Sequence, residues 1–143
     1  MDIGCGGGFA ALGLAELVGE EGMVYAVDIQ QPMLDFVKKR AQNMGVIKRF
    51  TFLRCSENKI EVEDDFFDFA NAFYMVHETP DTEKFIAEIY RVMKKGGLFF
   101  IAEPLFHVST SRFQKMVDIA SKQGFYIFAQ PKVFFSLSVL LAK

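Results

Sequence analysis

A glycine-rich segment at the start of the chain carries the clearest chemical signal. It reads Asp2-Ile3-Gly4-Cys5-Gly6-Gly7-Gly8 and precedes an apolar stretch with helical spacing. Glycines let the backbone turn sharply and let a ligand approach closely, and a helix start offers unpaired amide donors. The spacing matches G-x-G-x-G, whereas the dinucleotide fingerprint would need glycine or alanine where Phe9 stands. We predict a ligand-binding turn; the alternative is a tight turn without a ligand.

Asp28 is the second candidate, twenty residues after Gly8 and at the end of a short apolar run. A carboxylate at the end of a second strand accepts hydrogen bonds from the 2′ and 3′ hydroxyls of a ribose. A solvated strand end is the alternative for Asp28 taken alone. Together with the glycines, it predicts an adenosine-containing ligand whose ribose is not phosphorylated.

Polar side chains also follow the predicted fourth and fifth strands, where ligands of open α/β sheets bind. These residues are Tyr74, His77, Glu78 and His107. His77 is the best candidate for a general base, and a solvated loop histidine is the alternative. Glu103 precedes Pro104, so it either lines the substrate side or belongs to a turn that ends a strand.

The hydrophobic pattern predicts one α/β domain, residues 1–143, in which strands and helices alternate. We expect the first helix to be buried, because apolar residues cover most of its surface, and we expect Lys94 and Lys95 to lie at the end of the third helix. The tail has no helix between its two apolar runs, which predicts an antiparallel hairpin. The predicted strands are 23–27, 50–53, 67–73, 98–102, 125–128 and 133–141, and the predicted helices are 9–18, 32–44, 81–95 and 109–123.

Length, composition and net charge exclude some classes of function. The chain has 143 residues, is 51% hydrophobic and carries 16 basic against 18 acidic side chains, a net charge of -2. This balance argues against nucleic-acid coating and membrane insertion. The two cysteines, Cys5 and Cys55, lack a metal-ligand spacing and indicate a reducing compartment, so we expect a cytoplasmic protein that binds no metal. No basic segment leads into an apolar one at the start, so we expect no secretory signal.

At these residues the sequence resembles the class I S-adenosylmethionine-dependent methyltransferases. The glycine-rich segment is similar to that family's first motif, and Val27-Asp28-Ile29 to its second. Arg54 to Asn58 resembles the turn that contacts adenine, and Phe67 to Asp81 the fourth strand with its following loop. The segment 91–97 resembles the family's R-V-L-K-P-G-G, with Lys95 where proline is usual.

The resemblance implies a doubly wound, Rossmann-like, mostly parallel sheet with strand order 3-2-1-4-5-7-6 and an antiparallel strand seven. It implies that the first-motif residues lie against the methionine part of the cofactor, that Asp28 holds the ribose, and that Ser56 and Glu57 border the adenine. The cofactor-binding residues expected on this basis are Asp2, Gly4, Cys5, Gly6, Gly8, Asp28, Ile29, Ser56, Glu57 and Ala72.

Two departures from the family pattern have consequences. Cys55 stands where the family commonly has an aspartate that contacts the adenine amino group, and a thiol is a poorer acceptor. The apolar residues and helices that precede the first motif in the family are absent from the sequence. We expect that the chain is a fragment; the alternative is a reduced domain whose substrate cover comes from a partner.

The chemistry that the resemblance implies is direct displacement, in which a substrate nucleophile attacks an activated methyl group and no metal is required. Asn71-Ala72-Phe73-Tyr74 is not the motif of members that methylate nucleic-acid bases, so we expect a small-molecule acceptor. A homodimer is a further expectation. Two other functions stay open: a cofactor-binding or interaction module without turnover, and a nicotinamide oxidoreductase.

Overall fold

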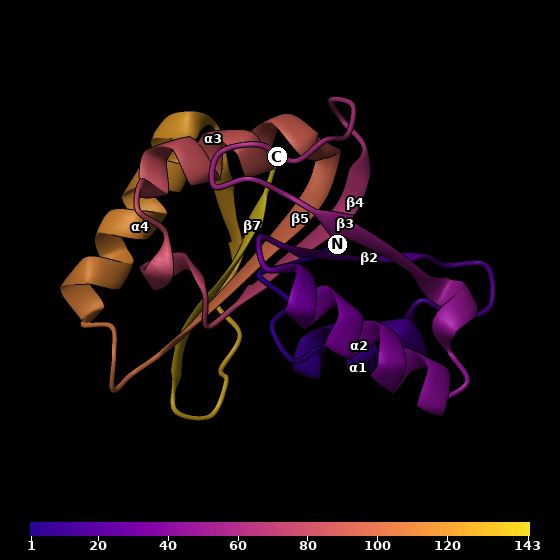
Figure 1. The fold of residues 1–143 in the computed structure, drawn as a ribbon. Coiled ribbons are helices and arrows are strands. Elements are labelled where there is room, and N and C mark those ends of the chain that lie inside the picture. The colour runs from indigo at the N-terminus through magenta and orange to yellow at the C-terminus, as the bar shows by residue number, and fades with distance from the viewer. The chain divides into compact units, whose positions relative to one another are not determined.

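A computed structural model describes residues 1–143, which form seven strands and four α-helices (Figure 1). The strands are β1 (Asp2–Ile3), β2 (Val24–Asp28), β3 (Phe50–Arg54), β4 (Phe67–Phe73), β5 (Met93–Pro104), β6 (Tyr126–Ala129) and β7 (Ser136–Ala142). The helices are α1 (Phe9–Leu17), α2 (Gln31–Asn43), α3 (Thr82–Val92) and α4 (Thr110–Gln123), with short 3₁₀ helices η1 (Ile47–Arg49) and η2 (Val76–Glu78).

The strand order is β3-β2-β1-β4-β5-β7-β6, with β7 antiparallel to both of its neighbours. The fold class expected from the sequence is therefore confirmed. The chain divides into two compact units, Met1–Ser56 and Glu57–Lys143, and each is described by itself.

The first unit packs α1 and α2 against the parallel strands β1, β2 and β3. Small or branched side chains meet at this interface, among them Ala11 and Ala15 of α1 and Val37 of α2, all fully buried. Helix α1 is buried against the strands as expected, but on one face only: Phe9 and Leu17 are about four-fifths exposed. Alanine lets α1 approach the strands on one face, so the larger residues at its ends stay in solvent.

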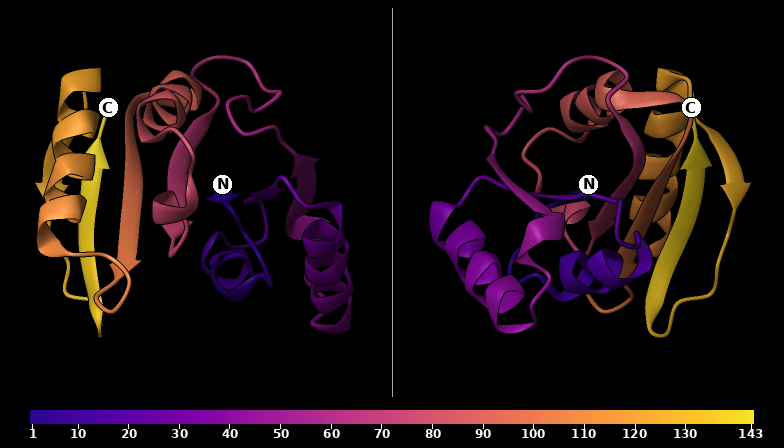
Figure 2. Two further views of the ribbon diagram at one scale, coloured as in Figure 1. Left: turned by 60° about the vertical axis from the view of Figure 1, so that its left-hand side comes forward. Right: turned by 90° about the vertical axis from the view of Figure 1, so that its right-hand side faces the viewer.

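The second unit places β4 parallel to β5 and adds the antiparallel strands β7 and β6. The tail hairpin predicted from the sequence is confirmed. Helices α3 and α4 contact each other beside this sheet, and the right-hand view of Figure 2 shows them side by side. Their buried residues, among them Phe85, Ile86 and Ile89 of α3 and Phe113 and Val117 of α4, form the core of the unit.

Local sequence explains where the helices of the second unit begin and end. Asp81 caps α3 by accepting a hydrogen bond from the Lys84 amide at 3.0 Å, and Ser109 caps α4 through the Arg112 amide at 3.2 Å. Gly124 ends α4 with a φ of 117°. Lys94 and Lys95 do not end α3 as expected. They lie at the start of β5, where the register against β4 shifts between Phe67 and Phe69.

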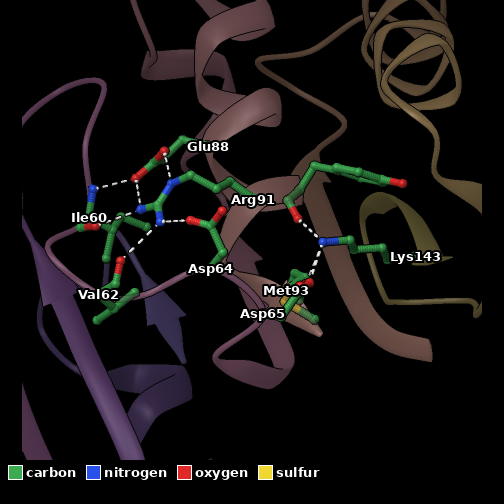
Figure 3. Close-up of polar contacts among 9 residues, drawn as sticks. Ile60, Val62, Asp64, Asp65, Glu88, Arg91, Met93 and Lys143 are labelled. Atoms are coloured by element: carbon green, nitrogen blue, oxygen red, sulfur yellow. Dashed lines mark hydrogen bonds and ion pairs between the residues drawn. The ribbon is translucent and has the colours of Figure 1, made fainter. Parts of the chain in front are cut away.

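Arg91 fixes the segment that leads into β4 (Figure 3). Its guanidinium donates to the carbonyls of Ile60 and Val62, at 2.9 and 3.0 Å, and to the carboxylates of Asp64 and Glu88, both at 2.6 Å. The pKa of Arg91 is raised, first by its hydrogen bond to Glu88. The segment is therefore attached to the last turn of α3 by a planar cation with several donors.

No helix of the chain combines the length and the apolar character that crossing a bilayer requires.

Candidate active site

The glycine turn of the first unit is a left-handed backbone stabilised by its own hydrogen bonds. Gly4, Gly6 and Gly8 have φ values of 64°, 47° and 79°, which glycine adopts without a Cβ clash. The Cys5 amide donates to the Val27 carbonyl at 3.1 Å, and the Gly8 amide donates to the Cys5 carbonyl at 2.8 Å. The turn thus runs from β1 into α1 over the carboxyl end of β2.

The two ends of this turn need glycine for different reasons. A Cβ on Gly8 would lie 2.9 Å from a methyl carbon of Val37, so this glycine allows α2 to pack closely. A Cβ on Gly6 would meet only the Gly4 carbonyl oxygen, at 4.0 Å, and would otherwise project into open space. Gly6 therefore leaves room above the turn that a side chain would fill, which fits the close approach of a cofactor.

Asp28 ends β2 beneath the turn and is 6% exposed. Its carboxylate accepts hydrogen bonds from the amides of Gly6 and Gln30, both at 2.9 Å. A carboxylate has about four acceptor sites, so two amides fix its orientation and leave capacity for further donors. Two hydroxyls of a ribose match that remaining capacity.

The two cysteines lie close to this carboxylate and stay protonated. Cys5 Sγ is 4.0 Å from Asp28 Oδ2, and the Cys55 amide donates to the Asp28 carbonyl at 3.1 Å. Burial, and then the charge of Asp28, raises the pKa of Cys5 to about 12 and that of Cys55 to about 11. Neither thiol is a thiolate at neutral pH, so the cysteines line the turn as neutral groups. The chain has no cluster of three or more side chains that would suit a metal ion.

The other residues expected at the cofactor are distributed as follows. Asp2 is buried in β1, paired in register with Ala26, and Ile29 is about half exposed just after β2. Ser56 is exposed in the turn that follows β3. Glu57 and Ala72 belong to the second unit, where Glu57 is exposed and Ala72 is fully buried within β4. The structure thus gathers the glycines, Cys5 and Asp28 in the first unit, whereas Ala72 is fully buried in the second.

His77 is the candidate general base and belongs to the second unit. It lies in η2, after the carboxyl end of β4, and its side chain is 14% exposed. Nδ1 of His77 is in hydrogen-bond contact with Oε2 of Glu103, near the end of β5. The Arg112 guanidinium donates to the His77 carbonyl at 2.9 Å, and the ring of His107 lies 6.0 Å from the His77 ring.

Glu103 is fully buried and is held on both of its oxygens. Oε1 accepts from the amides of Val76 and His77, at 2.9 and 3.3 Å, and Oε2 contacts the imidazole. Burial raises the pKa of Glu103, and the contacts with His77 oppose that rise. A carboxylate at Nδ1 fixes the tautomer with a proton on that nitrogen, so Nε2 is left to accept a proton. Glu78 lies near Nε2 at 3.9 Å, but its side chain is 73% exposed.

Glu103 is the functional residue whose role the sequence left open. The contact with His77 joins residues 26 positions apart on neighbouring strand ends, so no local spacing reveals it. One signal was available: an acid at the carboxyl end of an apolar strand is expensive to bury unless it has partners. Tyr74 is a second case, because its hydroxyl is 2.6 Å from Ser136 Oγ, 62 residues away.

Comparison with known proteins agrees with this architecture. Residues 1–101 match the family described as "Methyltransferase domain". A curated relative, the ubiquinone/menaquinone biosynthesis C-methyltransferase UbiE of Marinomonas sp. (strain MWYL1), is 30% identical over 103 residues, which are 72% of this chain and 41% of the relative. The chain thus spans less than half the length of this relative.

Two solved structures share the fold. A SAM-dependent methyltransferase from Aquifex aeolicus superposes with a TM-score of 0.87 at 27% identity, over 98% of this chain and 79% of the other. The [4+2]-cyclase SpnF has a TM-score of 0.78 at 24% identity, over 91% and 52% of the two chains. The likeness to SpnF concerns the fold alone.

The strand order, the antiparallel β7 and the glycine turn define the class of S-adenosylmethionine-dependent methyltransferases. The chain belongs to the methyltransferase domain family. The resemblance found in the sequence is therefore confirmed, and the nicotinamide alternative is disfavoured.

Proposed function

We propose that the chain is the core of an S-adenosylmethionine-dependent methyltransferase that acts on a small-molecule acceptor, with His77 as the general base. The observation that carries the proposal is the contact between Nδ1 of His77 and the fully buried Glu103. Burying a carboxylate costs desolvation free energy, and buried titratable pairs of this kind cluster at functional sites.

The first unit supplies the features that fit the cofactor. In the proposal, Asp28 accepts the ribose hydroxyls, the glycine turn lies against the methionine part, and Ser56 and Glu57 border the adenine. The open space at Gly6 and the remaining acceptor capacity of Asp28 support this assignment. Cys55 remains a weaker contact for adenine than an aspartate, because it is a neutral thiol.

When bound, the cofactor supplies a sulfonium methyl group: the acceptor forms a bond to that carbon, the carbon–sulfur bond breaks, and sulfur keeps the electron pair in S-adenosylhomocysteine. His77 Nε2 takes the proton that the acceptor loses. Glu103 holds the imidazole in the required tautomer and stabilises the cation that forms. His77 is a catalytic residue in this proposal, and Glu103 is a positioning residue.

The names of the curated relatives support a small-molecule acceptor. They are C-methyltransferases of ubiquinone and menaquinone biosynthesis, and carbon methylation of a ring requires loss of a proton. A base beside the acceptor is consistent with that chemistry. The identity of 30% over part of the chain supports the reaction class, and we propose no particular quinone on this basis.

The test combines binding and turnover. Calorimetry with S-adenosylhomocysteine and NADH is expected to give binding only for the former. Methyl transfer from labelled S-adenosylmethionine to a panel of phenols and hydroquinones then identifies a working acceptor. We expect His77→Ala to lower kcat by about 10²-fold or more, with S-adenosylhomocysteine affinity within a factor of a few.

His107→Ala is the matched control, because it removes the other histidine, which is exposed and lies close to His77. It should leave kcat within a factor of a few. Equal losses in both variants would contradict the assignment of the base. Binding of S-adenosylhomocysteine without transfer to any acceptor would favour a module without turnover.

A further inference from the structure

Four large apolar side chains are exposed together at one end of the second unit. Leu105 and Phe106 lie in the loop after β5, and Phe134 and Phe135 lie in the loop between β6 and β7. Their exposed fractions are 47%, 80%, 83% and 54%, in that order. Figure 2 shows the two loops at the same end of the unit in both views. We call these four residues the apolar rim; clustered exposed apolar side chains commonly mark a binding surface.

Backbone hydrogen bonds and ring contacts hold the rim in place. The Leu105 amide donates to the Phe135 carbonyl at 3.0 Å, which joins the two loops. The Phe135 ring packs against Phe106 and Phe134, with centroids 5.7 and 4.0 Å apart. The Ser136 amide closes the second loop by donating to the Val133 carbonyl at 3.1 Å. A surface ordered in this way loses little conformational entropy when it binds a ligand.

The rim is linked to the His77–Glu103 pair through the residues that follow Phe106 and Phe135 in the chain. Phe106 precedes His107, whose ring lies 6.0 Å from the His77 ring. On the other loop, Phe135 precedes Ser136, whose hydroxyl pairs with Tyr74, three positions before His77. Phe106 and Phe135 are thus sequence neighbours of His107, which contacts the His77 ring, and of Ser136, which contacts Tyr74, all within one unit.

Backbone strain is concentrated along the same path. Three non-glycine residues of the chain have positive φ, and two of them are Tyr74 at 60° and Phe135 at 53°. A left-handed conformation strains a non-glycine residue, and such strain clusters at binding and active sites. Tyr74 is one partner of the hydrogen bond to Ser136, and Phe135 directly precedes Ser136.

The charged residues near the rim indicate the charge of the ligand that it binds. Residues 104–117 and 119–143 contain no acidic side chain, whereas Arg112 and Lys132 lie in or beside the two loops. Glu78, whose side chain is 73% exposed, lies beside His77 and not on the rim loops. A cationic amine would find no counter-ion on these loops, and a neutral or anionic molecule would meet no like charge there.

We propose that the apolar rim binds the apolar body of the methyl acceptor, which is an amphiphilic, non-cationic weak acid whose ionisable hydrogen faces Nε2 of His77. This inference rests on the proposed function, because it takes His77 as the base. It adds the chemical class of the acceptor and the surface that recognises it. Phe106 and Phe134 are its main binding residues, since they are the most exposed.

A series of 4-alkylphenols tests the rim directly. The probes are 4-methylphenol, 4-butylphenol and 4-octylphenol, and their affinities are measured by calorimetry with and without saturating S-adenosylhomocysteine. In the wild type we expect each added methylene to tighten binding about two- to fourfold, as for a buried apolar chain. Phe106→Ala and Phe134→Ala should flatten this dependence on chain length and leave S-adenosylhomocysteine affinity unchanged.

Phe128→Ala is the matched control, because Phe128 is 60% exposed in the same unit but lies in β6, outside the rim. It should keep the wild-type gradient. A flat series in the wild type, or an equal loss in Phe128→Ala, would overturn the proposal.

Two further measurements separate other occupants of the rim. Sedimentation velocity reports a second copy, and co-sedimentation with phosphatidylcholine–phosphatidylglycerol vesicles reports a bilayer surface. Either association, lost in Phe134→Ala while the alkylphenol series is flat, would overturn the proposal in favour of that partner. If S-adenosylhomocysteine does not bind the wild type, the proposed function fails, and the gradient measured without it still decides whether the rim binds apolar chains.

Discussion

Asp28 in the first unit and Glu103 in the second are buried carboxylates near the carboxyl ends of their strands, and they are held differently. Asp28 accepts from the amides of Gly6 and Gln30, one on each oxygen, and its other close neighbour is the Cys5 thiol at 4.0 Å. Glu103 accepts two amides on one oxygen and contacts the His77 imidazole with the other. Asp28 therefore has acceptor capacity left for a ligand, whereas Glu103 uses its capacity to orient another side chain. In the proposed function, one buried carboxylate therefore binds the cofactor and the other positions the base.

The largest expected effect comes from removing Asp28, the carboxylate proposed to bind the ribose. Asp28→Ala should weaken S-adenosylmethionine binding by about 1.5 to 3 kcal/mol, because a charged acceptor for two hydroxyls is lost. Calorimetry measures the loss, and Asp35→Ala, at an exposed acid of α2, is the control. Unchanged affinity would mean that Asp28 is a strand end without a ligand.

The glycine turn above Asp28 gives a prediction about stability. Gly8→Ala should lower the free energy of unfolding by about 2 kcal/mol, because φ is 79° and the new Cβ would lie 2.9 Å from Val37. Gly13→Ala, within α1 and with nothing inside 4 Å of the new Cβ, should raise it by about 0.5 to 1 kcal/mol. Urea unfolding of both variants gives the comparison. Similar effects in the two would contradict the close packing of the turn on α2.

Replacing the positioning carboxylate tests the other half of the comparison. Glu103→Gln should lower kcat about tenfold, because His77 loses an anionic partner while keeping its place. Affinity for S-adenosylhomocysteine and KM for the acceptor should change by less than a factor of about three. A loss confined to KM would show that Glu103 shapes the acceptor site instead of orienting the base.

The smallest expected effect is a dependence of stability on pH. The pKa of Glu103 is raised by burial, so the native state holds its proton at pH values where the unfolded chain has released it. Its stabilising contribution is therefore present below the ordinary glutamate pKa and is lost as pH rises through the raised value. One proton limits the slope to about 1.4 kcal/mol per pH unit.

Unfolding free energies measured from about pH 4 to about pH 8 should show the wild type losing this contribution with rising pH relative to Glu103→Gln. Parallel curves for the two proteins would contradict the raised pKa. The expected sign is opposite to that of a carboxylate stabilised mainly by a salt bridge.

The sequence predicted the first of the two regions better than the second. The glycines form one short motif and Asp28 ends a strand, so both signals are local. The His77–Glu103 and Tyr74–Ser136 contacts depend on loops and strands that only the tertiary fold brings together. Local spacing cannot encode such pairs, and the sequence left the role of Glu103 undecided between two possibilities.

The difference between local signals and tertiary contacts also explains which helices and strands were predicted inaccurately. The strand order followed from the resemblance to the methyltransferase family, and the antiparallel hairpin followed from the absence of a helix between the two apolar runs of the tail. The composition of α1 predicted a helix buried against the sheet, but it did not reveal that alanines form the packed face and that Phe9 and Leu17 are exposed. Lys94 and Lys95 have the character of a helix end, but the register shift in β5 places them in the strand.

The contacts of Arg91 also determine how residues 60–66 separate from α3 during local unfolding of the second unit. The Ile60 amide donates to Glu88 at 2.7 Å, and the amides of Asp65 and Phe66 donate to the carbonyls of Arg91 and Val92 at 3.0 and 2.8 Å. These amides exchange with deuterium only when the segment separates from the last turn of α3. Hydrogen exchange should therefore report residues 60–66 and the end of α3 as one cooperative unit, and Arg91→Lys should accelerate exchange at both together, because an ammonium cannot reproduce the fork of donors.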